Sequence, residues 1–388
     1  MWWMTLLACA SEGPACFGAR VVDPIVEPGA DAPAPRPAVG EAPLVARLTA
    51  DVVAGAYPLR VSFDASGSEL GAGEVRREWS FGDGAVSGGG DRASHTFVGE
   101  GTFRVSVTLV DAQGADSTAE VTVQVSRPSC PEAAPAVAWG AVEDHGLEEL
   151  SGLVASRVEP DVFWVHEDSG NAPVLTAIDG SGATLSRHEL PDGFVDFEDL
   201  AAAVDPETGA PTLFLGDIGD NGHSRDEIVV WVAEEPHPGV DGPLSPLPMH
   251  LTYPGGARNA ETLLVDPVTF DLYVVTKGDA AEVYTKRAPH DAEGPFELEA
   301  LGSPPSLALL ATGGDVSPDG SRVVVRDYGE TARLWFRDGY LPLESAFDAE
   351  PCALPIHAEQ QGEAIGFVPG GVVTVSEGVG QPLYYIGF

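Results

Sequence analysis

Short runs of alternating apolar and polar residues cover most of the chain after residue 42. From Pro43 to Val125 these runs are LRVSFDAS, VRREWSFGDG, SHTFVGEGTFRVSVTLVDAQG and STAEVTVQV, and turns rich in Gly and Asp separate them. A period of two is typical of β-strands with one buried face. Strands of this spacing over about 80 to 100 residues predict an Ig-like sandwich, which we place at residues 43–126.

Residues 130–388 contain a diverged internal repeat, in which an acidic residue precedes an apolar run. Second and third apolar runs follow each acidic residue, as in LYVVTK and EVYTK. The copies begin at Glu149, Glu198, Glu261, Asp315 and Glu363. Their intervals are near the roughly 40 to 50 residues of a four-stranded propeller blade. The repeat therefore predicts a five-bladed β-propeller, with six blades as the alternative.

The fifth copy of the repeat is one strand short, whereas residues 135–142 (PAVAWGAV) are an apolar run without a partner. We expect this run to complete the last blade and to close the ring, because closure removes exposed sheet edges. The chain as a whole is therefore expected to be all-β.

Composition and charge narrow the classes of partner. The 388 residues include 20 Lys plus Arg and 60 Asp plus Glu, which gives a formal net charge of −40. Such a charge repels both the phosphate backbone of nucleic acids and anionic lipids. No run of about 18 apolar residues is present to span a bilayer. We therefore expect neither nucleic acid nor direct membrane insertion.

The segment MWWMTLLAC at residues 1–9 ends in LLAC, which resembles the lipobox of bacterial lipoproteins. The resemblance implies acylation of Cys9 and an exported protein, either secreted or lipid-anchored at the cell surface or in the periplasm. A frayed start is the alternative, because a basic n-region is lacking. Residues 10–42 are rich in Pro and Ala and are expected to be an extended linker. Among Cys16, Cys130 and Cys352, the last two make the better disulfide pair.

Four spaced motifs mark the first region, and they contain Trp79, Phe81, Gly82, Asp83 and Gly84; His95, Thr96 and Phe97; Gly101, Phe103 and Val105; and Asp111 and Gly114. Together they strongly resemble the PKD domain. PKD domains are generally spacers or adhesive modules in surface proteins, so the resemblance implies presentation rather than catalysis. Asp83 lies between two glycines, where a tight turn is favoured over a metal-binding loop.

The second region has its own motifs, which are ELSGL at 149, FEDLA at 197, LGDIGDN at 215–221, AETLLVDP at 260–267, LYVVTK at 272, TGGDVSPDG at 312–320 and QGEAIGF at 361. They resemble a set of secreted bacterial β-propeller proteins without an assigned function. Phytase-like and esterase-like propellers are more distant resemblances. The likeness implies a fold and an exported location, and it implies no reaction.

The acidic residues of the repeat are expected to start the innermost strands, so that five carboxylates crowd one mouth of the channel. They cannot all stay charged and unpaired there. Either a calcium ion binds them, or their pKa values rise until neighbours share protons. In a third reading, each carboxylate accepts backbone N–H bonds and clips neighbouring blades together. The candidate calcium ligands are Glu149, Glu198, Glu261, Asp315, Glu363 and Asp217.

Polar residues at the ends of the second strands form another candidate group. HEDSGN at 166–171 and GDIGDN at 216–221 offer oxygen ligands, although such residues are also common in turns. Lys277 is aligned with Glu167, Asp217, Asp327 and Glu377 of the other blades, so it is either a counter-charge or a binder of an anionic ligand. The candidate ligand-binding residues are Lys277, Arg326, His166 and Asp327.

Compact nucleophile, zinc and phosphate-loop motifs such as G-x-S-x-G and H-E-x-x-H are absent from the sequence. This favours a cell-surface or secreted binding or scaffold protein, in which a PKD module presents a propeller. Its channel mouth is a candidate site for calcium, the one candidate cofactor, and for an extracellular ligand or protein. The alternative is a calcium-dependent hydrolase of phosphoesters, lactones or esters, because propellers assemble sites from residues on separate blades.

Overall fold

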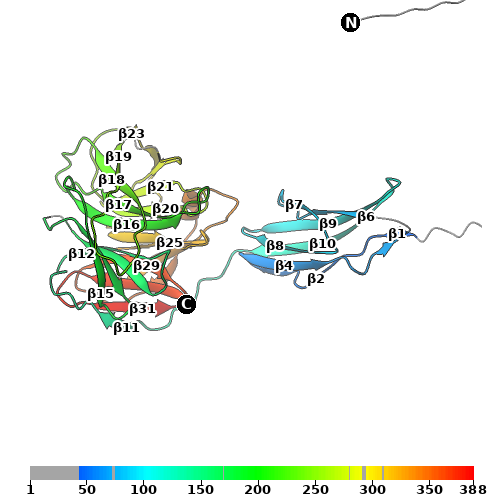
Figure 1. Ribbon diagram of the computed structural model, residues 1–388, viewed down its shortest axis with the longest axis horizontal. Helices are drawn as coiled ribbons and strands as arrows, with labels where there is room; N and C mark the ends of the chain where they lie inside the picture. Colours follow the sequence, from blue (N-terminus) through cyan, green and yellow to red (C-terminus); the bar gives the residue numbers. More distant parts are fainter. Residues whose placement is uncertain (1–42, 72–74, 169, 279, 291–293, 308–309) are drawn as a thin grey trace, which may run out of the picture. The chain divides into compact units, whose positions relative to one another are not determined.

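The computed structural model describes residues 43–71, 75–168, 170–278, 280–290, 294–307 and 310–388. The predicted signal at residues 1–9, with Cys9, and the predicted linker at 10–42 lie outside these residues. Strands dominate the described part (Figure 1), in which the one helix is the short 3-10 helix η1 (Leu343–Asp348). No helix among the described residues is long and apolar enough to cross a bilayer. The all-β prediction is confirmed.

Residues 44–126 form two main sheets, with strand orders β2-β4-β8 and β3-β10-β9-β6-β7, and a small pair of β1 with β5. The strands are β1 (Leu44–Val45), β2 (Thr49–Ala50), β3 (Ala54–Ala56), β4 (Leu59–Asp64), β5 (Glu69–Leu70), β6 (Val75–Ser80), β7 (Val86–Gly88), β8 (Arg92–Phe97), β9 (Gly101–Asp111) and β10 (Asp116–Ser126).

The alternation predicted for this region sets its core. Along β9, Phe103, Val105, Val107 and Leu109 are buried and the residues between them are more exposed. They pack with Trp79 on the neighbouring strand β6 and with buried apolar residues of β4 and β8 in the facing sheet. A period of two places every second side chain on one face, so apolar residues at that spacing close the sandwich.

The described residues from 137 to 387 form five further sheets, each built mainly from consecutive antiparallel strands. The first contains β12 (Leu150–Ala155), β13 (Val162–Glu167), β14 (Val174–Asp179) and β15 (Thr184–Glu189). The second contains β16 (Phe197–Val204), β17 (Pro211–Asp217), β18 (Ile228–Glu234), β19 (Leu247–Thr252) and the added β23 (Phe296–Glu297). The third contains β20 (Ala260–Val265), β21 (Leu272–Thr276), β22 (Val283–Lys286) and β24 (Glu299–Gly302).

The last two sheets follow the same plan. The fourth contains β25 (Gly313–Val316), β26 (Arg322–Arg326), β27 (Thr331–Phe336) and β28 (Cys352–Pro355). The fifth contains β29 (Gly362–Val368), β30 (Gly371–Ser376), β31 (Pro382–Gly387) and β11 (Val137–Ala141). Thus the apolar run at residues 135–142 pairs with the last strand of the chain, as expected, through antiparallel pairing of β11 with β31.

A disulfide joins Cys130, seven residues before β11, to Cys352 on β28 of the fourth sheet. The pair favoured from the sequence is therefore the pair that forms. Since β11 belongs to the fifth sheet, this covalent link holds the segment that leads into β11 against the neighbouring fourth sheet.

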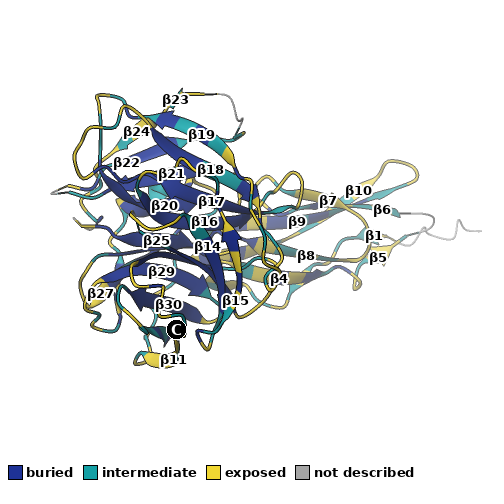
Figure 2. Ribbon diagram, turned by 60° about the vertical axis from the view of Figure 1, so that its left-hand side comes forward, coloured by how far each residue is buried: buried dark blue, intermediate teal, exposed yellow. Residues whose placement is uncertain are grey.

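The first strands of the five sheets are almost entirely buried (Figure 2), namely β12, β16, β20, β25 and β29. Each contacts the first strand of the next sheet, and β29 contacts β12. They are apolar on both faces, as in LAAAV of β16 and LLV of β20, because both faces are covered. Three buried glutamates at the starts of β16, β20 and β29 break this pattern.

Candidate functional site

The glutamates Glu198, Glu261 and Glu363 occupy the same kind of position. Each lies at a β-bulge, where the register between the first and second strands of its sheet shifts by one residue. A bulge places an extra residue on one strand and re-aims its side chain. The three side chains are therefore directed by an irregularity of the ladder rather than by the regular strand period. In the first sheet the bulge is at Ser151.

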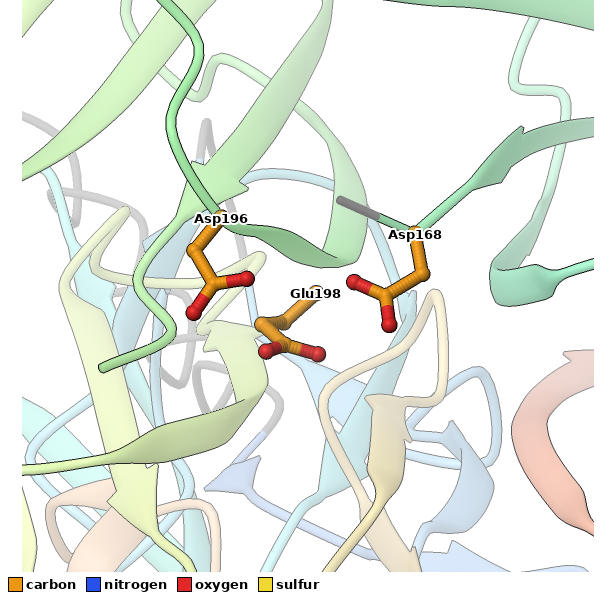
Figure 3. Close-up of side chains that lie close together, drawn as sticks. All are labelled: Asp168, Asp196 and Glu198. Carbon is orange, nitrogen blue, oxygen red and sulfur yellow. The ribbon is translucent and has the colours of Figure 1, made fainter. Parts of the chain in front are cut away.

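Glu198 belongs to a group of three carboxylates, which we call the acidic cluster and which consists of Asp168, Asp196 and Glu198. One oxygen from each lies within 4.8 Å of the others. Asp168 follows β13, and Asp196 immediately precedes β16. Figure 3 shows the carboxyl groups of Asp168 and Asp196 on either side of that of Glu198. Two neighbouring sheets thus supply hard oxygen ligands of the kind that calcium prefers.

The end of β17 and the loop after it position Asp196. The buried carboxylate of Asp217 accepts the backbone N–H of Asp196 at 2.8 Å and that of Val195 at 3.2 Å. Arg225 donates to the same carboxylate at 2.8 Å. The N–H of Gly219 then donates to the carbonyl oxygen of Asp196 at 3.1 Å. These bonds fix the backbone on which one carboxylate of the acidic cluster is carried.

Gly219 is also packed directly against the acidic cluster. A Cβ atom built on Gly219 would overlap the carboxylates of both Glu198 and Asp196. Only a residue without a side chain leaves the two carboxylates room to approach each other here. The glycine of the LGDIGDN motif is therefore part of the site.

Burial and charge act together on Glu198. Burial and the neighbouring carboxylates Glu261, Asp168 and Asp196 together raise its pKa to about 10, and Lys277 offsets part of the rise. The ionised form of Glu198 is therefore disfavoured at neutral pH unless a cation is close. A divalent ion at the acidic cluster would supply that charge and displace the proton.

Glu261, Lys277, Tyr328 and Glu363 form a second group, which we call the lysine network. The Lys277 ammonium donates to the Glu261 carboxylate and, at 2.7 Å, to the Tyr328 hydroxyl. Burial raises the pKa of Glu261 to about 7, and the bond from Lys277 limits the rise. Burial also raises the pKa of Glu363, with Lys277 and Tyr328 acting against it. Lys277 thus sits among carboxylates, in the position expected of a counter-charge.

Asp315 does not join these groups. It pairs in a regular ladder position with Val324 and is 3% exposed. Its Oδ1 accepts the N–H of Val316 at 2.8 Å and its Oδ2 accepts that of Phe367 on β29 at 2.7 Å. Asp199, next to Glu198, bonds in the same way to Leu263 on β20 at 2.8 Å. Asp315 and Asp199 therefore link neighbouring sheets by accepting backbone N–H bonds, as in the third reading of the sequence. The oxygens of Asp315 are used in these bonds, and Asp315 does not lie in the acidic cluster.

Two further predicted calcium ligands lie outside the acidic cluster. Glu149 is exposed and its Oε2 accepts a hydrogen bond from Asn171 at 2.7 Å. Asp217 is fully buried, and its oxygens are used by the backbone of residues 195 and 196 and by Arg225. Asp217 therefore positions the site instead of binding in it. Asp220 likewise caps the N–H groups of Ser224 and Arg225.

The remaining predicted ligand-binding residues are held by the fold. His166 is fully buried, stacks on Phe197 with ring centroids 3.5 Å apart, and its pKa is lowered by burial to about 3. Arg326 is buried and donates at 2.6 Å to Glu359 and at 3.0 Å to the carbonyl oxygen of Ala364. Asp327 caps the N–H of Gly329 at 2.8 Å. Of the four, Lys277 is the one that donates a hydrogen bond to a glutamate at a bulge, Glu261.

Three residues of the site were not singled out from the sequence, namely Asp196, Gly219 and Tyr328. Asp196 lies two residues before the repeat position, in a segment without periodicity. Tyr328 follows Asp327 by one residue, just beyond the aligned strand ends. The signal that was available is the LGDIGDN motif, whose Gly219 and Asp217 both act on Asp196.

Comparison with known proteins gives one family. The model described as PKD domain matches residues 41–125. No curated protein matches the chain. Among solved structures, the PKD1 domain of the Vibrio cholerae metalloprotease PrtV is 25% identical, covers 21% of this chain and 95% of its own, and has a TM-score of 0.19. The PKD1 domain of Vibrio anguillarum Epp is 28% identical, with coverages of 21% and 93% and a TM-score of 0.17.

A third similar structure is a protein of unknown function from Bacteroides thetaiotaomicron VPI-5482. It is 14% identical, covers 89% of this chain and 98% of its own, and has a TM-score of 0.37. At that score the likeness carries no argument for the region after residue 126. The assignment that the sequence motifs, the family model and the two-sheet fold support together is that residues 41–125 are a PKD domain.

Proposed function

We propose that this chain is an extracellular binding protein in which the PKD domain is followed by a calcium-binding, five-bladed β-propeller. Support for the propeller comes from five antiparallel sheets, from first strands that contact one another in a cycle, and from β11 completing the fifth sheet. A ring closed by the pairing of its two terminal strands leaves no sheet open between them. PKD domains are typical of extracellular bacterial proteins, which fits export.

The observation that carries the calcium site is the convergence of Asp168, Asp196 and Glu198. Three carboxylates at this separation repel one another, and burial makes the repulsion costly for Glu198. Calcium takes six to eight oxygen ligands, so water, backbone carbonyls or a ligand would supply the others. The Gly219 backbone, which leaves no room for a side chain, lets two of the carboxylates approach.

The role that follows is recognition of an extracellular ligand or protein at the end of the ring that holds the acidic cluster. A disulfide such as Cys130–Cys352 persists in oxidising compartments, which fits an exported protein. Acylation of Cys9 remains part of the proposal and is tested by replacing that cysteine with serine and fractionating cells. Retention of the variant on the membrane would remove the lipid anchor from the proposal.

Calorimetric titration of calcium into the metal-free protein tests the site. We expect one strong site in the wild type, and at least tenfold weaker binding in Asp196→Asn and Glu198→Gln. The matched control is Asp51→Asn, which removes one carboxylate from the PKD domain. Equal calcium affinity in the wild type and in Asp196→Asn would exclude the acidic cluster as the site.

The calcium-dependent hydrolase stays the alternative. A metal-bound water at the acidic cluster would be its nucleophile. Assays with phosphoesters, lactones and sugar esters in the presence of calcium test it. Turnover that is lost in Glu198→Gln, with folding intact, would replace the binding role by the hydrolase.

A further inference from the structure

A pocket of about 720 Å³ lies between the second and third sheets, at the strand ends opposite the acidic cluster. Its lining includes the turn after β16 and the turn after β20, with Val232 and Leu247 as apolar walls and Phe270 and His290 on the other side. Glu198 is at the start of β16 and this turn at its end, so the two sites are roughly 20 Å apart at 3.3 Å per residue. The pocket is therefore separate from the proposed calcium site.

Phe270 has a backbone conformation that is costly for its side chain. The turns Asp205–Ala210 and Asp266–Asp271 share the same pattern of backbone hydrogen bonds, with Gly209 and Phe270 at matching positions. Gly209 has φ +75° and Phe270 has φ +64°. Glycine adopts this left-handed region freely, whereas a bulky residue there is an outlier with a strained backbone. The aromatic ring of Phe270 thus lies at the pocket although the backbone conformation at this position favours glycine.

The ring of Phe270 is held in place by its neighbours. It packs edge-on against Phe214, with centroids 5.2 Å apart. The Nε2 of His290 donates to the carbonyl oxygen of Phe270 at 2.5 Å. The buried Nδ1 of His290 has no hydrogen-bond partner in the described part of the chain. Burial lowers the pKa of His290, so the ring stays neutral at pH 7 and Nδ1 remains an acceptor.

Every lining residue that is charged at neutral pH is acidic, namely Asp205, Glu207 and Glu234. The nearby Lys286 is already engaged, since its Nζ donates to the carbonyl oxygens of Arg287 and Pro289 and lies 4.8 Å over the Phe296 ring. Leu247 is 61% exposed and Val268 is 52% exposed, so the apolar walls are accessible. The pocket therefore combines an aromatic and aliphatic surface with negative charge and a neutral acceptor.

We propose that this pocket binds a small organic cation of the arylalkylammonium class, whose ring packs beside Phe270 and whose ammonium group is attracted by Asp205, Glu207 and Glu234. Pockets of this kind are mostly apolar, with a few polar groups that fix orientation. Glu207 and Glu234 are exposed and Asp205 is half-buried, and their negative charge attracts an ammonium group but not a neutral group of the same shape.

Titration with three probes of similar size tests the proposal, namely 2-phenylethylammonium, 2-phenylethanol and 3-phenylpropionate. Calorimetry or ligand-observed NMR is done with a chelator present, so that the result is independent of the calcium site. We expect the ammonium probe to bind at least fivefold more tightly than the alcohol, and the carboxylate most weakly. Equal binding of ammonium and alcohol, or no ammonium binding at millimolar concentration, would overturn the proposal.

Two variants separate the pocket from the fold. Phe270→Gly introduces the residue found at the matching position of the turn Asp205–Ala210, so the left-handed backbone conformation is kept without strain. We expect this variant to bind the ammonium probe at least fivefold more weakly. The double variant Glu207→Gln, Glu234→Gln should bind the ammonium probe more weakly and bind the alcohol with unchanged affinity. Circular dichroism and melting curves confirm folding. Wild-type affinity of the ammonium probe in Phe270→Gly would also overturn the proposal.

Discussion

The carboxylate of Asp315 on β25 accepts the backbone N–H of Phe367 on β29 at 2.7 Å, and so joins the fourth sheet to the fifth. The side chain is buried among first strands, and Arg157 from the first sheet approaches it to 3.9 Å. Burial raises the pKa of Asp315 to about 6, with Arg157 and the two backbone N–H groups acting against the rise. The carboxyl group of Asp315 is therefore protonated more readily in the folded chain than in the unfolded one.

The stability of the protein should depend on pH through Asp315. Because its folded pKa of about 6 is above the reference value of 3.8, its contribution is fully present below pH 4 and is lost as pH rises to 6. A pKa rise of this size corresponds to at most roughly 3 kcal/mol of unfolding free energy. Urea unfolding of wild type and Asp315→Asn between pH 4 and 7 measures it, with exposed Glu350→Gln as the control. A difference between wild type and Asp315→Asn that does not change with pH would contradict the assignment.

Gly219 should be essential for calcium binding. Its replacement by alanine puts a methyl group where the carboxylates of Glu198 and Asp196 lie. We expect Gly219→Ala to weaken calcium binding by at least tenfold in calorimetry. Gly222→Ala is the matched control in the same loop, because a Cβ there meets Ser224 Oγ only at 3.4 Å. Equal loss of binding in both variants would show that the loop, and not the contact with the acidic cluster, matters.

Lys277 and Glu261 should be energetically coupled. The side chains are 18% and 7% exposed, so removing the ammonium leaves a mostly buried carboxylate without its partner. We expect Lys277→Met to destabilise the fold, and Lys277→Met with Glu261→Gln to cost less than the sum of the single changes. A double-mutant cycle from urea unfolding should give a coupling of about 1 to 3 kcal/mol. Strict additivity is the result that would speak against a counter-charge.

The disulfide should stabilise the sheets that it links. Its cysteines are 222 residues apart, so it restricts a long loop of the unfolded chain. The double variant Cys130→Ser, Cys352→Ser should lose roughly 2 to 5 kcal/mol of unfolding free energy. Cys16→Ser is the control, since Cys16 takes no part in this bond. An unchanged denaturation midpoint in the double variant would contradict a stabilising role of the disulfide.

The strand pattern was largely predictable because burial on one or both faces leaves a periodic trace. Local or pairwise signals of this kind predict the PKD strands, the second and third strands of each repeat, the pairing of β11 with β31 and the Cys130–Cys352 bond. The closing strand could be predicted because an apolar run without a partner and a sheet that lacks a strand each require the other.

The site was less predictable because it depends on register. Aligning acidic residues equated Asp315 with Glu198, yet Glu198 lies at a bulge and Asp315 in a regular ladder position. A shift of one residue changes the direction of a side chain, and sequence spacing does not reveal a bulge. Asp196 was missed for a related reason, since its place depends on hydrogen bonds from Asp217 and Gly219 rather than on any period.

We propose that Asp168, Asp196 and Glu198 hold a calcium ion. The most direct test is a crystal of the wild-type protein grown with calcium, with anomalous scattering recorded to locate the ion. We expect a single strong peak about 2.3 to 2.6 Å from oxygens of all three carboxylates, and we expect that peak to be lost in Asp196→Asn. No peak among these carboxylates at a calcium concentration that saturates the protein in solution would contradict it.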